Sequence, residues 1–220
     1  EGPVLGEYSF SDLSLENLSS KLAPVYEALC LTKTALHKEG FDQTALIGFA
    51  GAPWTVACYM IEGGSSKDFA AVKSMAYARP AEFQKLIDLL AQATSIYLCA
   101  QIEAGAEVIQ IFESWASVLD APQFERWVIA PTKKIVQTVK QKHPNIPIIG
   151  FPRGAGLLYP DYLQQTGIDA LGIDSQISPA WARDHLQIHK PVQGNLNPMA
   201  LLAGGAALET AARKILDDLS

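Results

Sequence analysis

The stretch Ile47–Ser66, IGFAGAPWTVACYMIEGGSS, decides the fold prediction. It begins as a short apolar run of the kind found in buried strands, breaks at Gly51 and Pro53, and resumes with helical spacing. Proline suits the first turn of a helix, and glycine suits the position just after its end. The stretch therefore predicts a strand, a tight turn and a helix, which together begin a parallel βα unit.

Four further apolar runs repeat this pattern along the chain. Together they predict the strands Ala45–Phe49, Val108–Phe112, Pro147–Phe151, Ala170–Ile173 and Pro191–Gln193. Helical spacing of apolar residues predicts the helices Pro24–Lys38, Ala81–Ala104 and Gln123–Lys142. Each strand run is nearly all apolar, as expected for strands covered on both faces. Short strands that alternate with longer helices indicate a parallel sheet with crossover helices.

Glycines and polar residues gather after the carboxyl ends of the predicted strands. Gly51, Ser114, Arg153, Asp174 and Asn195 each follow a different strand, whereas the amino ends carry turn residues only. Parallel α/β folds build their active sites at the carboxyl ends. Because neither a G-x-G-x-x-G motif nor a P-loop follows any strand, we predict the (β/α)8 TIM-barrel family and not an open doubly wound sheet.

The 220 residues hold about five βα units of the eight that such a barrel needs. No Gly/Ser/Pro-rich linker or block of charge divides the chain, so residues 1–220 are expected to form a single domain. This domain is a partial (β/α) barrel that lacks N-terminal and C-terminal units. Since five strands do not close a barrel of eight, two sheet edges are expected to be unpaired.

Composition narrows the class of protein. The chain is 49% hydrophobic with a net charge of −6, which is typical of a globular domain with a large core and does not fit a basic nucleic-acid-binding surface. Cys30, Cys58 and Cys99 lie far apart in apolar helical patterns, so we expect reduced thiols, no metal site and a cytoplasmic protein. No apolar run is long enough to span a membrane.

Tyr59 and Ser114 are candidate site residues with competing interpretations. Tyr59 lies on the helix that leaves the first strand, where a tyrosine is more often a core residue with a satisfied hydroxyl than a ligand donor. Ser114, at the end of the second strand, is as readily a turn or helix cap as a binding residue. The neighbouring Glu113 and the strand-end Asp174 are candidates for an acid–base pair, or else brace their loops.

Arg153 is the arginine that follows a strand, whereas the other four arginines fall on predicted helices. The Gly154-Ala-Gly156 turn after it offers backbone N–H groups to an anion, although a single glycine turn is a weak signal. Phe49 and Phe112 are expected to give the mouth of the barrel an apolar lining.

The quoted motifs resemble, in order along the chain, the uroporphyrinogen decarboxylase family. They are IGFAGAPWTVACYMIEGGSSKDF, GAEVIQIFESWAS, FPRGAG, LGIDS and QGNLNPMALLAGG. The resemblance implies a (β/α)8 barrel of which this chain is the central portion, strands three to seven. It also implies a homodimer that works without metal or organic cofactor and removes carbon dioxide from the four acetate side chains of uroporphyrinogen III, giving coproporphyrinogen III.

The resemblance also assigns roles to residues. Tyr59 matches a tyrosine that bonds a substrate carboxylate at the reacting pyrrole, and Ser114 matches a serine that binds another substrate side chain. Phe49, Gly51 and Phe112 match residues that line the cleft. The implied reaction protonates the pyrrole, loses carbon dioxide from the cationic ring and reprotonates the product.

The family's arginine-rich, aspartate and histidine motifs from other strands lie outside these 220 residues. Only Arg153 is placed to meet one of the eight carboxylates of the substrate, so the isolated chain is expected to be inactive. Two alternatives remain open. One is a corrinoid or coenzyme M methyltransferase of the same barrel superfamily, which would need His and Cys zinc ligands at strand ends. The other is a non-catalytic fragment that binds porphyrinogens.

Overall fold

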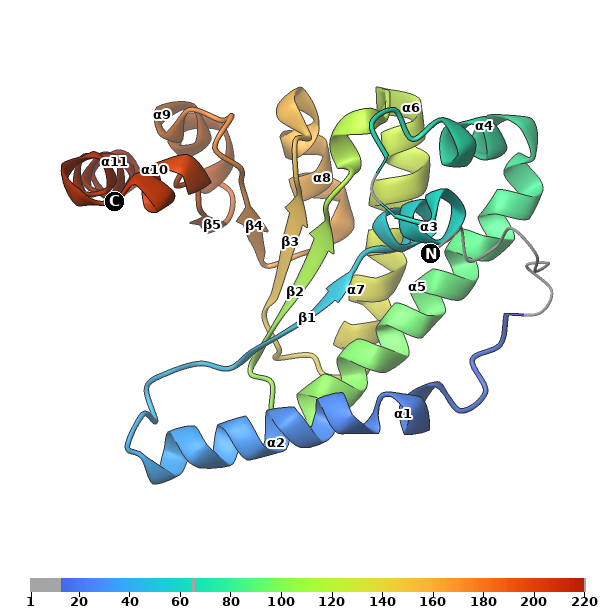
Figure 1. Cartoon of the computed structure of the whole chain (residues 1–220), viewed down its shortest axis with the longest axis horizontal. Coiled ribbons are helices and arrows are strands. Elements are labelled where there is room, and N and C mark those ends of the chain that lie inside the picture. The colour runs from blue at the N-terminus through green and yellow to red at the C-terminus, as the bar shows by residue number, and fades with distance from the viewer. Residues whose placement is uncertain (1–12, 65, 220) are drawn as a thin grey trace.

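A five-stranded parallel sheet forms the centre of the computed structural model, which describes residues 13–64 and 66–219 (Figure 1). The strands are β1 (Ile47–Gly51), β2 (Val108–Glu113), β3 (Ile148–Pro152), β4 (Ala170–Gly172) and β5 (Val192–Gln193). They lie side by side in chain order, and every neighbouring pair is parallel. The five predicted strands are thereby confirmed, with ends that differ by at most two residues.

The strand, turn and helix predicted for the opening stretch are present. Helix α3 (Pro53–Glu62) begins with proline in its first turn and ends at Gly63, whose φ is +76°. This left-handed conformation favours glycine and lets the Gly63 N–H donate to the Tyr59 carbonyl at 3.0 Å. The predicted glycine end of the helix is therefore confirmed by its local chemistry.

Most of the longer helices follow strands, as βα units require. The helices of eight residues or more are α2 (Ala23–Lys38), α3, α4 (Ala70–Ala78), α5 (Pro80–Glu103), α7 (Ala130–Lys142), α8 (Tyr159–Thr166) and α11 (Gly205–Leu219). The shorter ones are α1 (Leu18–Lys21), α6 (Ala121–Phe124), α9 (Pro179–Ala182) and α10 (Pro198–Ala203). The predicted helix Gln123–Lys142 spans α6, a π-helical turn at Glu125–Ile129, and α7. The sequence analysis did not predict α4, α8 or α11.

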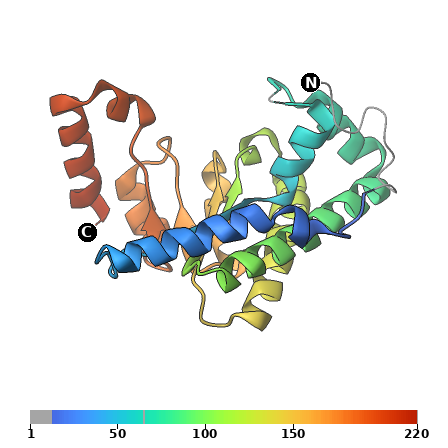
Figure 2. The ribbon, with the colours of Figure 1, turned by 60° about the horizontal axis from the view of Figure 1, so that its bottom comes forward.

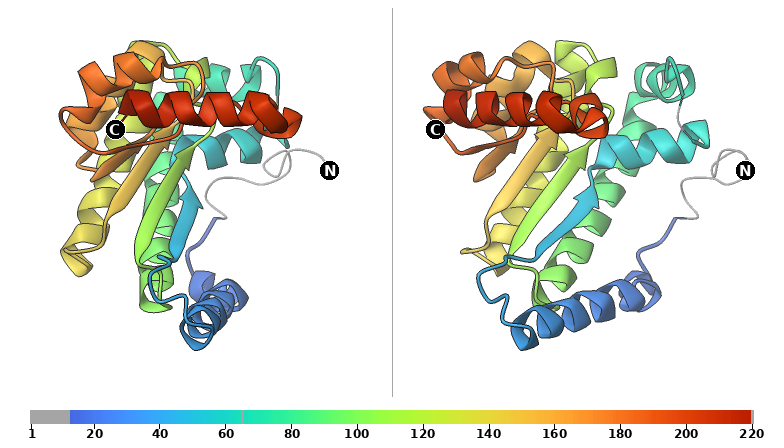
Figure 3. Two further views of the ribbon diagram at one scale, coloured as in Figure 1. Left: turned by 90° about the vertical axis from the view of Figure 1, so that its left-hand side faces the viewer. Right: turned by 60° about the vertical axis from the view of Figure 1, so that its left-hand side comes forward.

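Helices α5 and α7 pack behind the sheet and bury one of its faces (Figure 3). Side chains on that face, such as Ile109 and Ile111, are fully buried. Behind them the Phe83 ring meets Trp54 and Trp127 edge-on, with centroids 5.9 and 4.8 Å away. Tertiary packing of these apolar helix faces holds the layers together.

The opposite face of the sheet is open in the described residues. Its alternate side chains include Ile47 and Phe49 on β1, which are 41% and 59% exposed. The expectation that all strands are covered on both faces is therefore wrong. The reason is that β1 and β5 are sheet edges, so the described strands do not close around the face that a complete barrel turns inward.

The outer edge of β1 is capped by one side chain from α5. The Phe49 N–H donates to the Gln101 Oε1 at 3.0 Å, and the Gln101 Nε2 donates back to the Phe49 carbonyl at 2.9 Å. Gly48 makes this approach possible, because a Cβ there would lie 2.8 Å from the Gln101 Oε1. An amide side chain thus satisfies the backbone groups of Phe49 at this edge.

Helices at the two sides of the molecule contribute little to the core. Helix α2 crosses the amino ends of the strands, and α11 lies beyond β5 (Figure 2). Neither α2 nor α10 nor α11 has a buried residue, and Leu202 and Leu216 are 80% and 69% exposed. No helix in residues 13–64 or 66–219 combines the length and apolarity needed to cross a membrane.

Candidate active site

The carboxyl ends of β2, β3 and β4 form a small cleft of about 170 Å³. It is lined by Ser114, Trp115, Ser117, Arg153, Gly154, Asp174, Ser175 and Gln176. Of the predicted site residues, Ser114 and Arg153 are thus brought together, although they are far apart in the sequence. The parallel register places both loops at the same end of the sheet.

Arg153 presents a free guanidinium to this cleft. Its side chain is exposed, and no described residue forms a hydrogen bond or an ion pair with the guanidinium. The other four arginines have partners at helix surfaces or ends: Arg79 with Glu82, Arg126 over the Trp127 ring, Arg183 with Asp184, and Arg213 with Glu209. Among the described residues, Arg153 is therefore the arginine whose guanidinium forms no hydrogen bond, ion pair or ring contact, which leaves it accessible to an anionic ligand.

Asp174 braces the loops around the cleft. Its Oδ2 accepts from the Gly154 N–H and the Tyr159 hydroxyl, both at 2.6 Å, and its Oδ1 accepts from the Gln176 N–H at 2.9 Å. Burial alone would raise the pKa of Asp174, but the hydrogen bonds from Tyr159, Gln176 and Gly154, with a smaller attraction from the Arg153 charge, outweigh it and hold the pKa below its usual range. The Asp174 carboxylate thus already accepts hydrogen bonds from the loops around it, and its role is to hold these loops in place.

Glu113 lies under the strand ends and does not open into the cleft. Its side chain is fully buried on the helix-covered face, where Oε1 accepts a short hydrogen bond from the Thr55 hydroxyl. Burial raises the pKa of Glu113 to about 8, against the opposing effect of hydrogen bonds from Thr55 and Trp54. The structure shows no contact between Glu113 and Asp174, so the acid–base pair considered from the sequence is not formed in the described residues.

Tyr59 is not a core residue, contrary to the commoner interpretation of its position. It is 44% exposed, and its ring packs edge-on against Trp115, with centroids 6.1 Å apart. Its hydroxyl forms no hydrogen bond to any described residue. Because Trp115 itself lines the cleft, it links Tyr59 to Ser114 and Arg153.

Three phenylalanine rings form a row on the open face of the sheet beside the cleft. Phe49 meets Phe112 edge-on at 5.8 Å, and Phe112 meets Phe151 edge-on at 5.9 Å. Phe151 was not among the predicted site residues, although it lies two positions before Arg153. Gly172 leaves it room, because a Cβ there would lie 2.9 Å from the Phe151 ring.

Gly51, the last predicted lining residue, ends β1 where the chain turns into α3. A Cβ on Gly51 would lie 3.2 Å from the Val56 side chain, so the residue keeps the turn tight. The sequence analysis missed Thr55 and Trp115. Their signals were present in the P-W-T and E-S-W segments, but spacing alone does not reveal that Thr55 reaches across to Glu113.

A family model described as Uroporphyrinogen decarboxylase (URO-D) matches residues 1–220. The chain belongs to the uroporphyrinogen decarboxylase family.

Curated members of the family align with nearly all of the chain. The uroporphyrinogen decarboxylase of Rhodospirillum rubrum is 48% identical over 223 residues, covering 100% of this chain and 63% of the relative. That of Sphingopyxis alaskensis is 49% identical over 203 residues, covering 92% and 58%. The chain thus spans about 60% of the length of these relatives.

A solved structure with a similar fold is a methyltransferase from Methanosarcina mazei. Its TM-score is 0.73 at 21% identity, over 88% of this chain and 55% of the methyltransferase. Identity this low shows the fold alone, and the family match favours the decarboxylases over the methyltransferase alternative. Within residues 13–64 and 66–219, no three His, Cys, Asp or Glu side chains are grouped to hold a metal ion.

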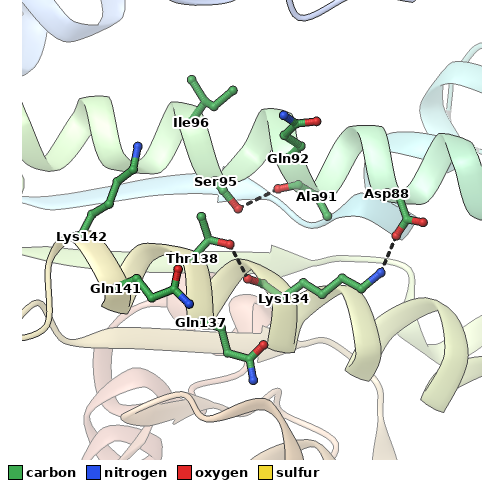
Figure 4. A pocket seen from close by; sticks show the side chains of 10 residues that line it. All are labelled: Asp88, Ala91, Gln92, Ser95, Ile96, Lys134, Gln137, Thr138, Gln141 and Lys142. Carbon is green, nitrogen blue, oxygen red and sulfur yellow. Dashed lines mark hydrogen bonds and ion pairs between the residues drawn. The ribbon is translucent and has the colours of Figure 1, made fainter.

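A larger hollow than the cleft lies elsewhere, between α5 and α7 (Figure 4). It measures about 570 Å³ and is lined mainly by polar side chains. Its Lys134 is paired with Asp88 at 2.6 Å, and the Ser95 and Thr138 hydroxyls donate to carbonyls of their own helices. The residues that match the motifs of the uroporphyrinogen decarboxylase family, Ser114 and Arg153, line the strand-end cleft and not this larger groove.

Proposed function

We propose that this chain supplies strand-end residues of a uroporphyrinogen decarboxylase. The reaction is that of a carboxy-lyase, which converts the four acetate groups of uroporphyrinogen III to methyl groups and gives coproporphyrinogen III. The names of the relatives and the family match over residues 1–220 support this proposal. The structural observation that carries it is the unpaired Arg153 guanidinium beside Ser114, at one end of a row of phenylalanine rings.

Each predicted site residue has a distinct role in this proposal. Arg153 binds a substrate carboxylate by a charge-assisted hydrogen bond. Ser114 binds a second side chain of the substrate, and the Tyr59 hydroxyl donates to the carboxylate at the reacting pyrrole. Phe49 and Phe112, with Gly51 at the turn, line the surface on which the macrocycle lies.

The chemistry needs no electron sink from the protein. Protonation of the pyrrole α-carbon makes a cationic ring, which accepts the electron pair when the bond from the methylene carbon to the carboxylate breaks. Protonation of that methylene carbon and loss of the ring proton then give a methyl group and restore the pyrrole. The rings of Phe49, Phe112 and Phe151 offer π-electron density to the cationic intermediate, so their part is electrostatic.

The remaining properties of the proposal rest on the family resemblance and on composition. We infer a homodimeric protein of the cytoplasm in which residues 1–220 belong to one domain and which uses neither metal nor organic cofactor. The net charge of −6 supports a small-molecule substrate over nucleic acid as the ligand. The free thiols of Cys30, Cys58 and Cys99 are compatible with a reducing compartment.

A second candidate function is binding without turnover. It is favoured because, among the described residues, a single arginine without a hydrogen bond or ion pair lines the cleft, whereas the substrate carries eight carboxylates. Both functions are tested by giving the chain enzymatically generated uroporphyrinogen and separating the products by chromatography, while tryptophan quenching reports binding. Stepwise loss of carboxyl groups supports the enzyme, and binding without loss supports the second candidate. If the chain neither binds uroporphyrinogen nor removes carboxyl groups from it, both candidates are contradicted.

Tyr59→Phe is expected to weaken binding of uroporphyrin, the stable oxidised form of the substrate, about tenfold. Because the Tyr59 hydroxyl has no partner among the described residues, the thermal unfolding midpoint should not change. Tyr77→Phe is the matched control: Tyr77 is also an exposed helix tyrosine, but its hydroxyl donates to Asp120 at 2.6 Å. Equal effects of the two substitutions on affinity would contradict the role of Tyr59.

A further inference from the structure

Buried polar side chains gather directly beneath the cleft, on the helix-covered face of the sheet. Glu113, Thr132 and Tyr162 are fully buried, and Thr55 is 5% exposed. They come from β2, α7, α8 and α3 respectively. Burying four polar side chains from four elements costs free energy unless they form hydrogen bonds with one another or have a function.

The hydrogen bonds in this group run in one direction. The Ser114 backbone N–H donates to the Thr55 Oγ1 at 2.7 Å. Thr55 has one hydroxyl proton, which it donates to the Glu113 Oε1. Glu113 is therefore the terminal acceptor of a chain of hydrogen bonds that begins at the backbone of Ser114, a residue that lines the cleft.

The second carboxyl oxygen, Glu113 Oε2, has no partner among the described residues, while the Thr132 and Tyr162 hydroxyls interact with each other and form a hydrogen bond with no other described side chain. The Tyr162 hydroxyl lies over Gly150, whose Cβ would be 2.7 Å away. Gly150 pairs with Ile111, which shares the helix-covered face with Glu113. An ionised carboxylate would leave this buried oxygen both charged and unpartnered, so the site favours a proton on it.

The charges around Glu113 favour that proton. The titratable groups that face it are Cys58 on α3 and Tyr162 on α8, and burial raises the pKa of both, so both stay neutral. No lysine or arginine of the described residues forms an ion pair with Glu113. With its own pKa raised to about 8 by burial, the carboxyl is neutral at pH 7.

We propose that Glu113 is a positioning residue that remains protonated beneath the strand ends and, through Thr55, fixes the backbone of Ser114 at the mouth of the site. The hydrogen-bond part of this inference stands without a ligand. Its consequence for binding rests on the proposed function.

The same proton makes the effect dependent on pH. Glu113 has a folded-state pKa of about 8 against an ordinary value of 4.5. Its stabilising contribution is therefore complete below pH 4.5, falls as the pH rises, and is lost above pH 8. Because an ionised carboxylate without a cationic partner favours opening of this buried region, the Ser114 amide should lose protection from hydrogen exchange, measured relative to the unstructured amide, between pH 5 and pH 8. Glu113→Gln should remove this pH dependence, because glutamine is neutral at every pH.

NMR hydrogen exchange at the Ser114 amide of the 220-residue chain tests the proposal. Thr55→Val removes the relay and is expected to lower the protection of Ser114 about tenfold, whereas Glu113→Gln should retain it at pH 7. Thr138→Val is the control, because the Thr138 hydroxyl donates only to its own helix. Unchanged protection in Thr55→Val, or protection in the wild type that does not vary from pH 5 to pH 8, would overturn the proposal.

Uroporphyrin titrations of the same variants separate this inference from the proposed function. The inference predicts that Thr55→Val weakens binding and that Glu113→Gln preserves it at pH 7. If the wild-type chain does not bind uroporphyrin while the exchange results hold, the proposed function fails and the positioning role of Glu113 stands. If uroporphyrin binds but the Ser114 amide behaves identically in all variants, the positioning role fails instead.

Discussion

Trp54→Ala is expected to lower the free energy of unfolding by about 3–5 kcal/mol, the range for truncating a fully buried tryptophan. Trp54 is inaccessible to solvent, its ring meets Phe83 on α5, and its Nε1 donates to the Trp115 carbonyl at 3.1 Å. The substitution therefore leaves a cavity between α3 and α5 and releases the loop that follows β2. Urea denaturation followed by circular dichroism measures the loss.

Two further variants separate packing from hydrogen bonding at this position. Trp54→Phe keeps an aromatic ring but loses the indole N–H, and its expected cost is about 1–3 kcal/mol. Trp181→Ala is the control, because Trp181 is only half-buried at the edge of the core, where it stacks on His185 after β4. A loss for Trp54→Ala no greater than that for Trp181→Ala would show that α3 is not anchored as described.

Arg153→Leu is expected to weaken uroporphyrin binding by about 10- to 100-fold, because a hydrogen bond between charged groups is lost. The guanidinium forms no hydrogen bond or ion pair with a described residue, and its attraction to Asp174 is the smallest of the influences on that carboxylate, so its removal costs the fold little. The unfolding midpoint should therefore hold while the affinity falls. Fluorescence titration at two salt concentrations measures the affinity, and added salt should weaken the wild type more than the variant.

Arg153→Lys and Arg213→Leu are the matched variants for this prediction. Lysine keeps the positive charge at the strand end and should retain most of the affinity. Arg213 is an exposed arginine of α11 that is paired with Glu209 and does not line the cleft, so its loss should leave binding unchanged. A similar fall in affinity for Arg213→Leu would indicate a non-specific charge effect.

Hydrophobic runs and turn residues were sufficient to predict the sheet. All five strands were found because parallel strands are short apolar runs bounded by glycine and proline. Helix α8 was missed because its Tyr159–Thr166 segment is short and its polar residues obscure the helical spacing. The two unpaired sheet edges were predicted and are confirmed at β1 and β5, but the openness of the Phe49 face was not foreseen, since an apolar strand is expected to be covered on both faces.

The sequence was sufficient to locate the site at the strand ends, but it was not sufficient to predict which way each side chain points or what it binds. Strand-end position correctly brought Ser114 and Arg153 together, because the carboxyl ends of parallel strands meet. It did not distinguish Glu113, which points beneath the sheet, from Asp174, which lies at the cleft, since a one-residue step along a strand reverses the face. Thr55 was missed because its partners lie 58 and 59 residues away along the chain.

Hydrogen exchange with mass spectrometry, with and without uroporphyrin, tests most directly the claim that the strand-end cleft is the ligand site. The account predicts protection on binding in residues 53–62, 112–117 and 151–156, which hold Tyr59, Ser114 and Arg153. It predicts no change in residues 88–96 and 134–142, which line the larger groove between α5 and α7. Protection confined to that groove, or absent at the strand ends when uroporphyrin is bound, would contradict the account.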